Sequence, residues 1–456
     1  MKRVACAACL LLLCAAGAES REQSLRERYF QAGWATVDAG AEAPVPDAPG
    51  RPLPAEDDPS GGTDAPVRDL HNPIAHMFFT RQAYLMYAAQ FSGGELSRYI
   101  GEFDGNKPPA GAHDTVLAGT YDEDQPRLNP FGDVIPNLAH FWDCRKGPFA
   151  GIPGSDSAVN RAQKFFTGGY GLDGKYDRAW GDGRGRLAGK RGMGAVALYR
   201  AGEKNAAYWY LGHVAHLLED LTVPAHAHRW AHLLPGSAVY EEFIKSAYPR
   251  WSEVPSGPVD SFETLYDLFL RTDTVTLRYD TGSGSGPLRG RNGTVDAGRR
   301  RAGGFTQEEL DEEGDALIPL AIRSAAALFV YFYRQVDEAP PRVTLSYPAS
   351  ADPEAATLAL GPAVELSASA VDAASGVDRK GFRFLHARRS ADGWSAWGEV
   401  PGDGGPRARF APEPGVLYAV KATARDAAGN LGESAVGYLR AAPAVASAAS
   451  GLELVE

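Results

Sequence analysis

The stretch YWYLGHVAHLLEDLTVPAHAHRWAHLLPGSAVYEE (208–242) decides how the fold of this chain is interpreted. His216 and Asp220 are four residues apart, a spacing that places both side chains on one face of a helix, one turn apart. Pro224 predicts that this helix has ended, and His226 follows on the next turn. Imidazole and carboxylate groups in this pattern suit a divalent metal ion. The sequence therefore predicts a metal site on a helix.

The length and net charge of the chain indicate its number of domains and its class of partner. A chain of 456 residues is too long for one ordinary core, so we expect two domains with flexible ends. The composition, 44% apolar and 23% charged, is typical of globular proteins. The formal net charge of −11 argues against broad binding to a phosphate backbone, so nucleic acid is not the favoured partner.

The amino-terminal residues 1–18 have the features of a secretory signal peptide. Two basic residues precede an apolar run from Val4 to Ala16, and small residues follow up to an expected cleavage after Ala18. The run is too short to cross a membrane. Lipid attachment at Cys14 is disfavoured because a large leucine precedes it. We expect a secreted, periplasmic or cell-envelope protein.

The composition and the hydrophobic pattern of the rest of the chain predict several different segments. Residues 19–69 are rich in Ala, Pro, Asp and Gly and predict a disordered leader. Residues 70–337 predict an all-α domain, and residues 442–456 a flexible tail. Helices are expected at 74–91, at 193–223 with a break near Gly202, at 261–270, and from the capping box Thr306–Glu309 to about Val336.

Residues 341–441 show the two-residue period of strands, at 343–345, 364–368 and 418–424. Short strands separated by Gly and Asp turns predict a β-sandwich of about a hundred residues. This segment resembles bacterial immunoglobulin-like or fibronectin type III-like modules, mainly through Tyr418 and the ending Asp426-x-Ala-Gly-Asn430. The expected fold is therefore multidomain, with an α-helical domain followed by an all-β sandwich.

The run His216-x3-Asp220-x3-Pro224-x-His226 resembles the signature of the zinc-dependent phospholipase C family, whose fold is shared with single-strand-specific zinc nucleases. The resemblance covers residues 71–337. It implies an all-α domain in which zinc ions, two or three of them here, are held by His, Asp and Glu side chains and by the amino terminus of the chain.

The resemblance also implies which residues hold the zinc ions. Asp220 would be shared between two ions, and Asp124 would bind one ion while orienting the attacking water or taking its proton. Asp122 is a close rival for that aspartate position. The full set of implied ligands is His76, Asp124, His140, His216, Asp220, His226 and Glu241.

This chain departs from the family pattern at three positions. Ser237 stands where a histidine ligand is expected, and either His228 or His232 could replace it or that zinc site is incomplete. The amino-terminal ligand is missing because cleavage after Ala18 leaves some fifty residues before the first helix, so His71 is a possible substitute. His213 lies on the same helix face as His216 and has no counterpart in the family, which favours a supporting role behind the ligands.

The chemistry implied is hydrolysis of a phosphodiester. Zinc ions roughly 3.5–4 Å apart neutralise phosphate oxygens and acidify a water molecule that attacks phosphorus. We expect a secreted phospholipase C-type enzyme acting on phospholipid head groups or another phosphodiester, with the β-sandwich docking it on a membrane or the cell envelope. The alternatives are a single-strand nuclease of the same fold and a zinc-containing cell-surface binding protein without activity.

Overall fold

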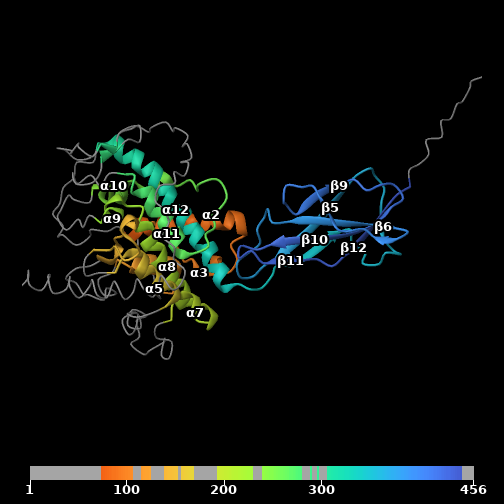
Figure 1. The fold of residues 1–456 in the computed structure, drawn as a ribbon, viewed down its shortest axis with the longest axis horizontal. Coiled ribbons are helices and arrows are strands. Elements are labelled where there is room, and N and C mark those ends of the chain that lie inside the picture. Colours follow the sequence, from red (N-terminus) through yellow and green to blue (C-terminus); the bar gives the residue numbers. More distant parts are fainter. Residues whose placement is uncertain are drawn as a thin grey trace, which may run out of the picture. The chain divides into compact units, whose positions relative to one another are not determined.

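The computed structural model describes residues 73–105, 114–124, 138–152, 156–168, 193–229, 239–279, 288–289, 295–296 and 306–443. It divides into two compact units. The first holds the described residues up to Met86 and from Arg98 to Tyr331, and it is helical. The second holds Tyr87–Ser97 and the described residues from Phe332 onward, and it is rich in β-strands (Figure 1).

Several predictions from the sequence lie outside the described residues. They are the signal peptide 1–18, the leader 19–69, the tail from 444 onward, and the candidate residues His71, His232 and Ser237.

The predicted helices are confirmed. The expected break near Gly202 separates α7 from α8, and the helix expected at 261–270 begins at Leu265. The main helices are α2 (Pro73–Phe91), α4 (Val116–Asp122), α5 (Ala158–Thr167), α7 (Ala195–Arg200), α8 (Lys204–Asp220), α9 (Pro224–Ala227), α10 (Val239–Ala247), α11 (Leu265–Thr276) and α12 (Gln307–Val336). Shorter elements are α3 (Leu96–Tyr99), η3 (Leu138–His140), η4 (Cys144–Lys146), η5 (Tyr248–Trp251), β1 (Leu288–Arg289) and β2 (Val295–Asp296).

Side-chain caps fix where several helices begin. The predicted capping box is present, with Glu309 N donating to Thr306 Oγ1 at 3.3 Å and Thr306 N donating to Glu309 Oε2 at 2.8 Å. Thr115 caps α4 through a bond from Ala118 N at 3.2 Å. Pro224 occupies the first turn of α9, where a missing N–H costs nothing, so the proline that follows α8 also begins the next helix.

Helix α8 is the centre of the helical unit. It is buried from Ala206 to Asp220 on all sides, as expected for a helix surrounded by others. It packs against α4, α5 and α7, and Figure 1 shows α5 and α7 beside it. Side chains that project from α8 are therefore enclosed by protein whichever way they point.

The crossing of α4 and α8 depends on two glycines. A Cβ on Gly119 would lie 1.9 Å from Trp209 O, and a Cβ on Gly212 would lie 2.0 Å from Val116 O. Neither position can carry a side chain without moving a backbone. The close approach lets Thr120 Oγ1 reach Gly212 O at 3.2 Å and brings the residues that follow α4 next to the second half of α8.

Helix α12 is long and apolar enough to cross a membrane by length and composition, with a mean hydropathy of 1.6 over its most apolar window. Within the structure 72% of that window is buried. A helix buried to this extent has the character of a core helix.

The second unit contains two sheets. One has the strand order β4 (Thr357–Ala359), β12 (Gly437–Ala441), β10 (Leu417–Arg425), β6 (Arg383–Ser390) and β7 (Gly393–Trp394), with β11 (Leu431–Glu433) on β10 and β8 (Gly398–Val400) on β6. The other has the order β3 (Arg342–Tyr347), β5 (Val364–Val371) and β9 (Arg407–Phe410). The pairs are antiparallel except β4–β12, which is parallel.

Both sheets contribute to one buried apolar cluster, to which Leu366 of β5 and Val420 of β10 belong. The strands predicted at 343–345, 364–368 and 418–424 are confirmed. The likeness to immunoglobulin-like modules stays a prediction. Its motif at 426–430 makes the turn after β10: Asp426 Oδ1 accepts from Asn430 N at 2.8 Å, and Oδ2 accepts from Asn430 Nδ2 at 3.0 Å.

One segment groups differently from the domain boundaries expected from the sequence. The end of α2 and the residues up to Ser97 belong to the β-rich unit. Glu95 N donates to Ala374 O at 2.8 Å, and Arg379 N donates to Gln90 O at 3.0 Å. Backbone hydrogen bonds to residues nearly three hundred positions away cannot be seen in a periodicity pattern.

We predict that Gly212→Ala destabilises the helical unit by about 1–3 kcal/mol, because its Cβ would overlap the carbonyl of Val116. Urea unfolding of the metal-free protein measures the change. Gly402→Ala is the matched control, since its Cβ meets only Ala408 Cβ at an ordinary 3.6 Å. Equal losses in the two variants would contradict the role of the α4–α8 contact.

Candidate metal centre

The carboxylate of Asp220, the last residue of α8, is surrounded by imidazoles. Its Oδ2 lies 2.6 Å from His140 Nδ1 and 3.2 Å from His216 Nε2. Its Oδ1 lies 3.4 Å from His226 Nδ1 and 3.5 Å from His76 Nε2. Asp220 is fully buried. The four histidines predicted as ligands thus meet at the one aspartate predicted to be shared.

These histidines come from four separate elements. His76 belongs to α2, His140 to η3, His216 to α8 and His226 to α9. The rings of His76 and His216 are stacked, with centroids 4.0 Å apart and an interplanar angle of 27°. The site therefore forms only when distant segments of the helical unit pack together.

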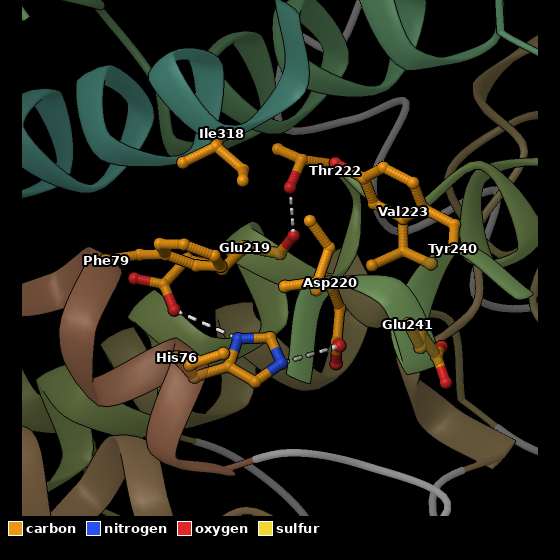
Figure 2. A pocket seen from close by; sticks show the side chains of 11 residues that line it. His76, Phe79, Glu219, Asp220, Thr222, Val223, Tyr240, Glu241 and Ile318 are labelled. Carbon is orange, nitrogen blue, oxygen red and sulfur yellow. Dashed lines mark hydrogen bonds and ion pairs between the residues drawn. The ribbon is translucent and has the colours of Figure 1, made fainter. Parts of the chain in front are cut away.

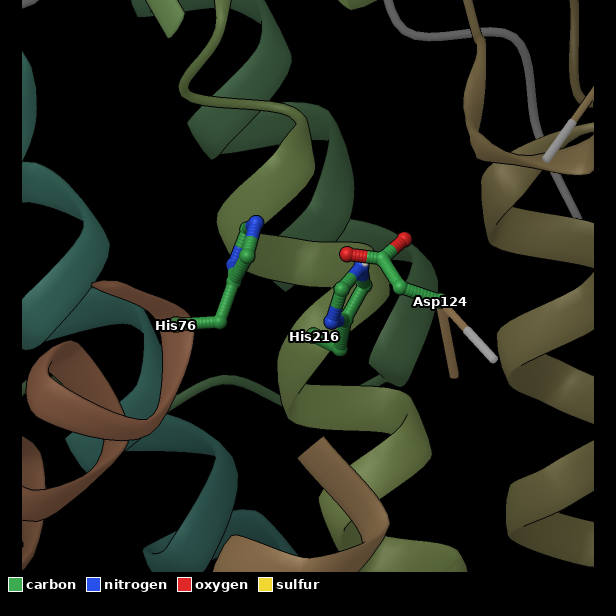
Figure 3. Close-up of side chains that lie close together, drawn as sticks. All are labelled: His76, Asp124 and His216. Atoms are coloured by element: carbon green, nitrogen blue, oxygen red, sulfur yellow. Dashed lines mark ion pairs between the residues drawn. The ribbon is translucent and has the colours of Figure 1, made fainter. Parts of the chain in front are cut away.

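Asp124 and Glu241 extend the cluster on either side. Asp124 follows α4, and its Oδ1 lies 3.3 Å from His216 Nε2 and 3.8 Å from His140 Nδ1. Figure 3 shows the carboxylate of Asp124 beside the His216 ring, with His76 on the other side of that ring. Glu241 of α10 places Oε1 at 2.9 Å from His226 Nε2. The structure thus brings all seven predicted ligands into one connected group.

Two overlapping sets could each hold an ion, because their ligand atoms lie within 4.8 Å of one another: His76, Asp124 and His216, and His140, His216 and Asp220. His216 belongs to both sets. Nitrogen and oxygen donors of this kind are those that zinc prefers.

The shortage of hydrogen-bond donors around the Asp220 carboxylate, within the described part of the chain, also fits a bound cation. Among the described residues, no hydrogen-bond donor other than the imidazole nitrogens reaches either oxygen of this buried carboxylate. A buried carboxylate without strong donors is costly, and a bound cation removes that cost. The donor set and its burial are therefore ones that could hold a metal ion.

Outer polar contacts set which nitrogen of the His216 and His140 rings faces Asp220. His216 Nδ1 lies 2.8 Å from Thr120 O, a carbonyl that can only accept, so Nδ1 carries the proton and Nε2 presents its lone pair to the aspartates. His140 is reversed: its Nε2 lies 3.4 Å from Glu123 Oε1, and its Nδ1 faces Asp220. Metal-ligating histidines are commonly held in this way.

Burial and charge shift the pKa values within the cluster. Burial alone raises the pKa of Asp220, but His216, His226 and His140 outweigh it and hold that pKa well below its usual range. Burial alone lowers the pKa of His216, whereas Asp124 and Asp220 raise it well above its usual range. The pKa of His140 is likewise lowered by burial and raised overall by Asp220 and Glu123.

Three other residues singled out from the sequence lie around the cluster. Asp122 Oδ2 accepts from Trp209 Nε1 at 3.0 Å, which directs that carboxylate to the indole. His213 stacks on Phe165 with centroids 4.5 Å apart. His228 Nε2 lies 2.9 Å from Tyr279 O. These contacts favour Asp124 over Asp122 as the inner aspartate, while the ligand roles themselves stay predictions.

Sequence reasoning did not single out two buried glutamates. Glu123 accepts from Arg161 Nε and also contacts His213 and His140. Glu219 Oε2 lies 3.0 Å from His76 Nδ1, and burial raises the pKa of Glu219 well above its usual range. Each glutamate directly precedes a predicted aspartate ligand, which is the one sequence signal that could have drawn attention to it.

A cavity opens beside the cluster between α2, α8, α10 and α12 (Figure 2). Its wall carries both ionisable and apolar side chains. The ionisable lining residues are His76, Glu219, Asp220 and Glu241, and the apolar or uncharged ones are Ala75, Phe79, Thr222, Val223, Tyr240, Ile244 and Ile318.

Comparison with solved structures finds similarity to the alpha toxin of Clostridium absonum. The identity is 13%, the match covers 81% of this chain and 96% of that chain, and the TM-score is 0.36. The alpha toxin of Clostridium perfringens from an avian strain matches at 12% identity over 80% of this chain and 97% of that chain, with a TM-score of 0.33. No protein-family model matches the sequence, and no curated protein matches it.

We predict that the metal-free protein loses stability as the pH rises from about 6.5 to about 8. His140 and His216 have pKa values raised above 6.5 in the folded state, so their contribution is present below 6.5 and is lost as the pH rises through the folded values. The lowered pKa of Asp220 acts oppositely, with a contribution that is lost only as the pH falls below 3.8.

Added zinc should reverse this trend, because zinc competes with protons for the same nitrogens and binds more tightly as the pH rises. Urea unfolding with chelator and with zinc, at both pH values, measures the two effects. Zinc stabilisation that does not change with pH would contradict histidine ligation.

Proposed function

We propose that this chain is a secreted zinc-dependent phosphodiesterase of the phospholipase C type. The observation that carries the proposal is the buried Asp220 carboxylate, with four imidazoles within 3.5 Å. The order of His216, Asp220, Pro224 and His226 in the sequence, which resembles the zinc-dependent phospholipase C signature, gives the proposal its reaction class.

The residues that would hold zinc are His76, Asp124, His140, His216, Asp220, His226 and Glu241. When bound, clustered zinc ions neutralise the charge on phosphate oxygens and make water acidic enough to act as a nucleophile near neutral pH. Hydrolysis breaks the bond between phosphorus and the glycerol oxygen. Water supplies a hydroxyl to phosphorus and a proton to the departing oxygen.

The protein's own residues prepare that reaction by position and by burial. Asp124 has one oxygen toward His216, and its carboxylate is suited to orient a water or to accept its proton. The buried rings exclude bulk water, which strengthens every charge interaction within the site. Because these side chains come from packed helices, little reorganisation is needed when the substrate arrives.

The lining of the cavity beside the cluster is one reason to propose a phospholipid rather than a nucleotide as substrate. Its lining includes the apolar side chains of Phe79, Ile244 and Ile318 together with the imidazole of His76 and three carboxylates. A substrate with a charged phosphodiester next to an apolar portion matches both surfaces. The net charge of −11 disfavours the long anionic strand of a nuclease substrate.

We further propose that the β-rich unit is an immunoglobulin-like docking module for a membrane or the cell envelope. Trp394 and Trp397 are partly exposed, and Leu360 is 83% exposed. Arg389 lies 5.4 Å from the centre of the Trp394 ring, and Lys421 lies 5.0 Å from that of Trp397. Aromatic rings next to cations suit an anionic interface.

We predict that Asp220→Asn lowers zinc affinity by at least roughly 100-fold and abolishes hydrolysis, because it removes the charge that four imidazoles share. Zinc content after gel filtration and the rate of hydrolysis measure the two losses. Asp260→Asn is the control, since Asp260 is exposed and lies in the same helical unit. Unchanged zinc content in Asp220→Asn would exclude the proposed centre.

Substrate class can be tested with the mature protein loaded with zinc. We expect release of a phosphorylated head group from phosphatidylcholine vesicles and little cleavage of single-stranded DNA. Faster cleavage of DNA than of phosphatidylcholine would show that the same site is that of a nuclease. No product from either substrate at full zinc content would favour a binding protein.

A further inference from the structure

We propose that Glu219 is a positioning residue that holds the His76 ring so that Nε2 is presented to the metal centre. The inference rests on the proposed metal centre and adds a residue to it. Glu219 Oε2 lies 3.0 Å from His76 Nδ1, and Oε1 accepts from Thr80 Oγ1 at 2.7 Å. Figure 2 shows the carboxylate of Glu219 and that of Asp220 on opposite sides of the His76 ring.

The two partners of Glu219 belong to one face of one helix. His76 and Thr80 are four residues apart on α2, so their side chains lie one turn apart on the same face. Glu219 is 1% exposed and Thr80 is completely buried. A single carboxylate on α8 therefore fixes both the place where α2 docks and the rotation of the His76 ring.

The direction of the ring decides which nitrogen can bind a metal. A neutral imidazole carries one proton, and a ligating nitrogen must be the one without it. With the proton on Nδ1 and donated to Glu219 Oε2, the lone pair of Nε2 points toward Asp220 Oδ1, 3.5 Å away. Outer carboxylates that accept from a ligating histidine in this way raise its basicity and its affinity for metal.

A second Glu-Asp pair is placed in a related way. Glu123 precedes Asp124 as Glu219 precedes Asp220. In each pair the aspartate faces the cluster, and the glutamate contacts a histidine from another segment, His140 in the first pair. Adjacent side chains project in different directions, so one Glu-Asp pair can supply both an inner ligand and an outer acceptor. Glu219 is the better test because Arg161 and His213 also depend on Glu123.

The test compares zinc affinity in wild type, Glu219→Ala and Glu219→Gln, measured by competition with a chromophoric chelator. We expect Glu219→Ala to weaken the most affected zinc by roughly 10–100-fold. Glu219→Gln keeps an oxygen that can accept from Nδ1, so we expect a smaller loss. Glu203→Gln is the matched control. It makes the same chemical change at the amino-terminal end of α8, about 24 Å along the helix from Glu219.

A second readout separates ring positioning from a general loss of stability. Nitrogen-15 spectra of histidine side chains in the zinc-loaded protein should show Nδ1 of His76 protonated in wild type and in Glu219→Gln. In Glu219→Ala that proton should exchange with solvent faster than in wild type. If Glu219→Ala fails to fold, as judged by circular dichroism, the position of the proton on the His76 ring in the zinc-loaded wild type decides the question.

The outcomes distinguish this inference from the proposed function. Zinc affinity equal to wild type in folded Glu219→Ala, or a His76 ring protonated on Nε2 in the zinc-loaded wild type, overturns the role of Glu219 alone. A wild-type protein that takes up no zinc overturns the metal centre itself, and the inference with it.

Discussion

The structure of the helical unit depends on the burial of one carboxylate among imidazoles. Asp220 lies at the end of the central helix, and rings from four elements converge on it. Burying any one of these polar groups alone would cost free energy, and their mutual contacts reduce that free energy of burial. We infer that the cluster favours the one packing of helices that brings these groups together, in addition to the chemistry that we propose for it.

Two kinds of contact make that convergence possible. Gly119 and Gly212 let α4 and α8 approach until backbone atoms touch, which brings Asp124 within 3.3 Å of His216. Outer acceptors then orient the rings, with Thr120 O behind His216 and Glu219 behind His76. Backbone packing sets the distance between segments, and the outer hydrogen bonds set the direction of each lone pair. A metal centre requires both.

The proposed enzyme and a purely structural metal protein would share the same ligands, and the cavity is what separates the two readings. A closed structural site has no need of a space lined by His76 and Glu241 together with the apolar Phe79 and Ile318. The β-rich unit adds exposed tryptophans beside cations. An enzyme that acts at a membrane could use them, whereas an enzyme with a soluble substrate would not need them.

Local sequence determined the helices, the strands and the spacing of His216 and Asp220, because capping, periodicity and proline act over a few residues. Tertiary structure alone decided that Asp124 faces the cluster while Asp122, still within α4, turns to Trp209. It also decided that Glu219 contacts His76 and that Tyr87–Ser97 belongs to the β-rich unit. These outcomes depend on partners more than a hundred positions away or on where a helix ends against its neighbour, and no short-range pattern records either.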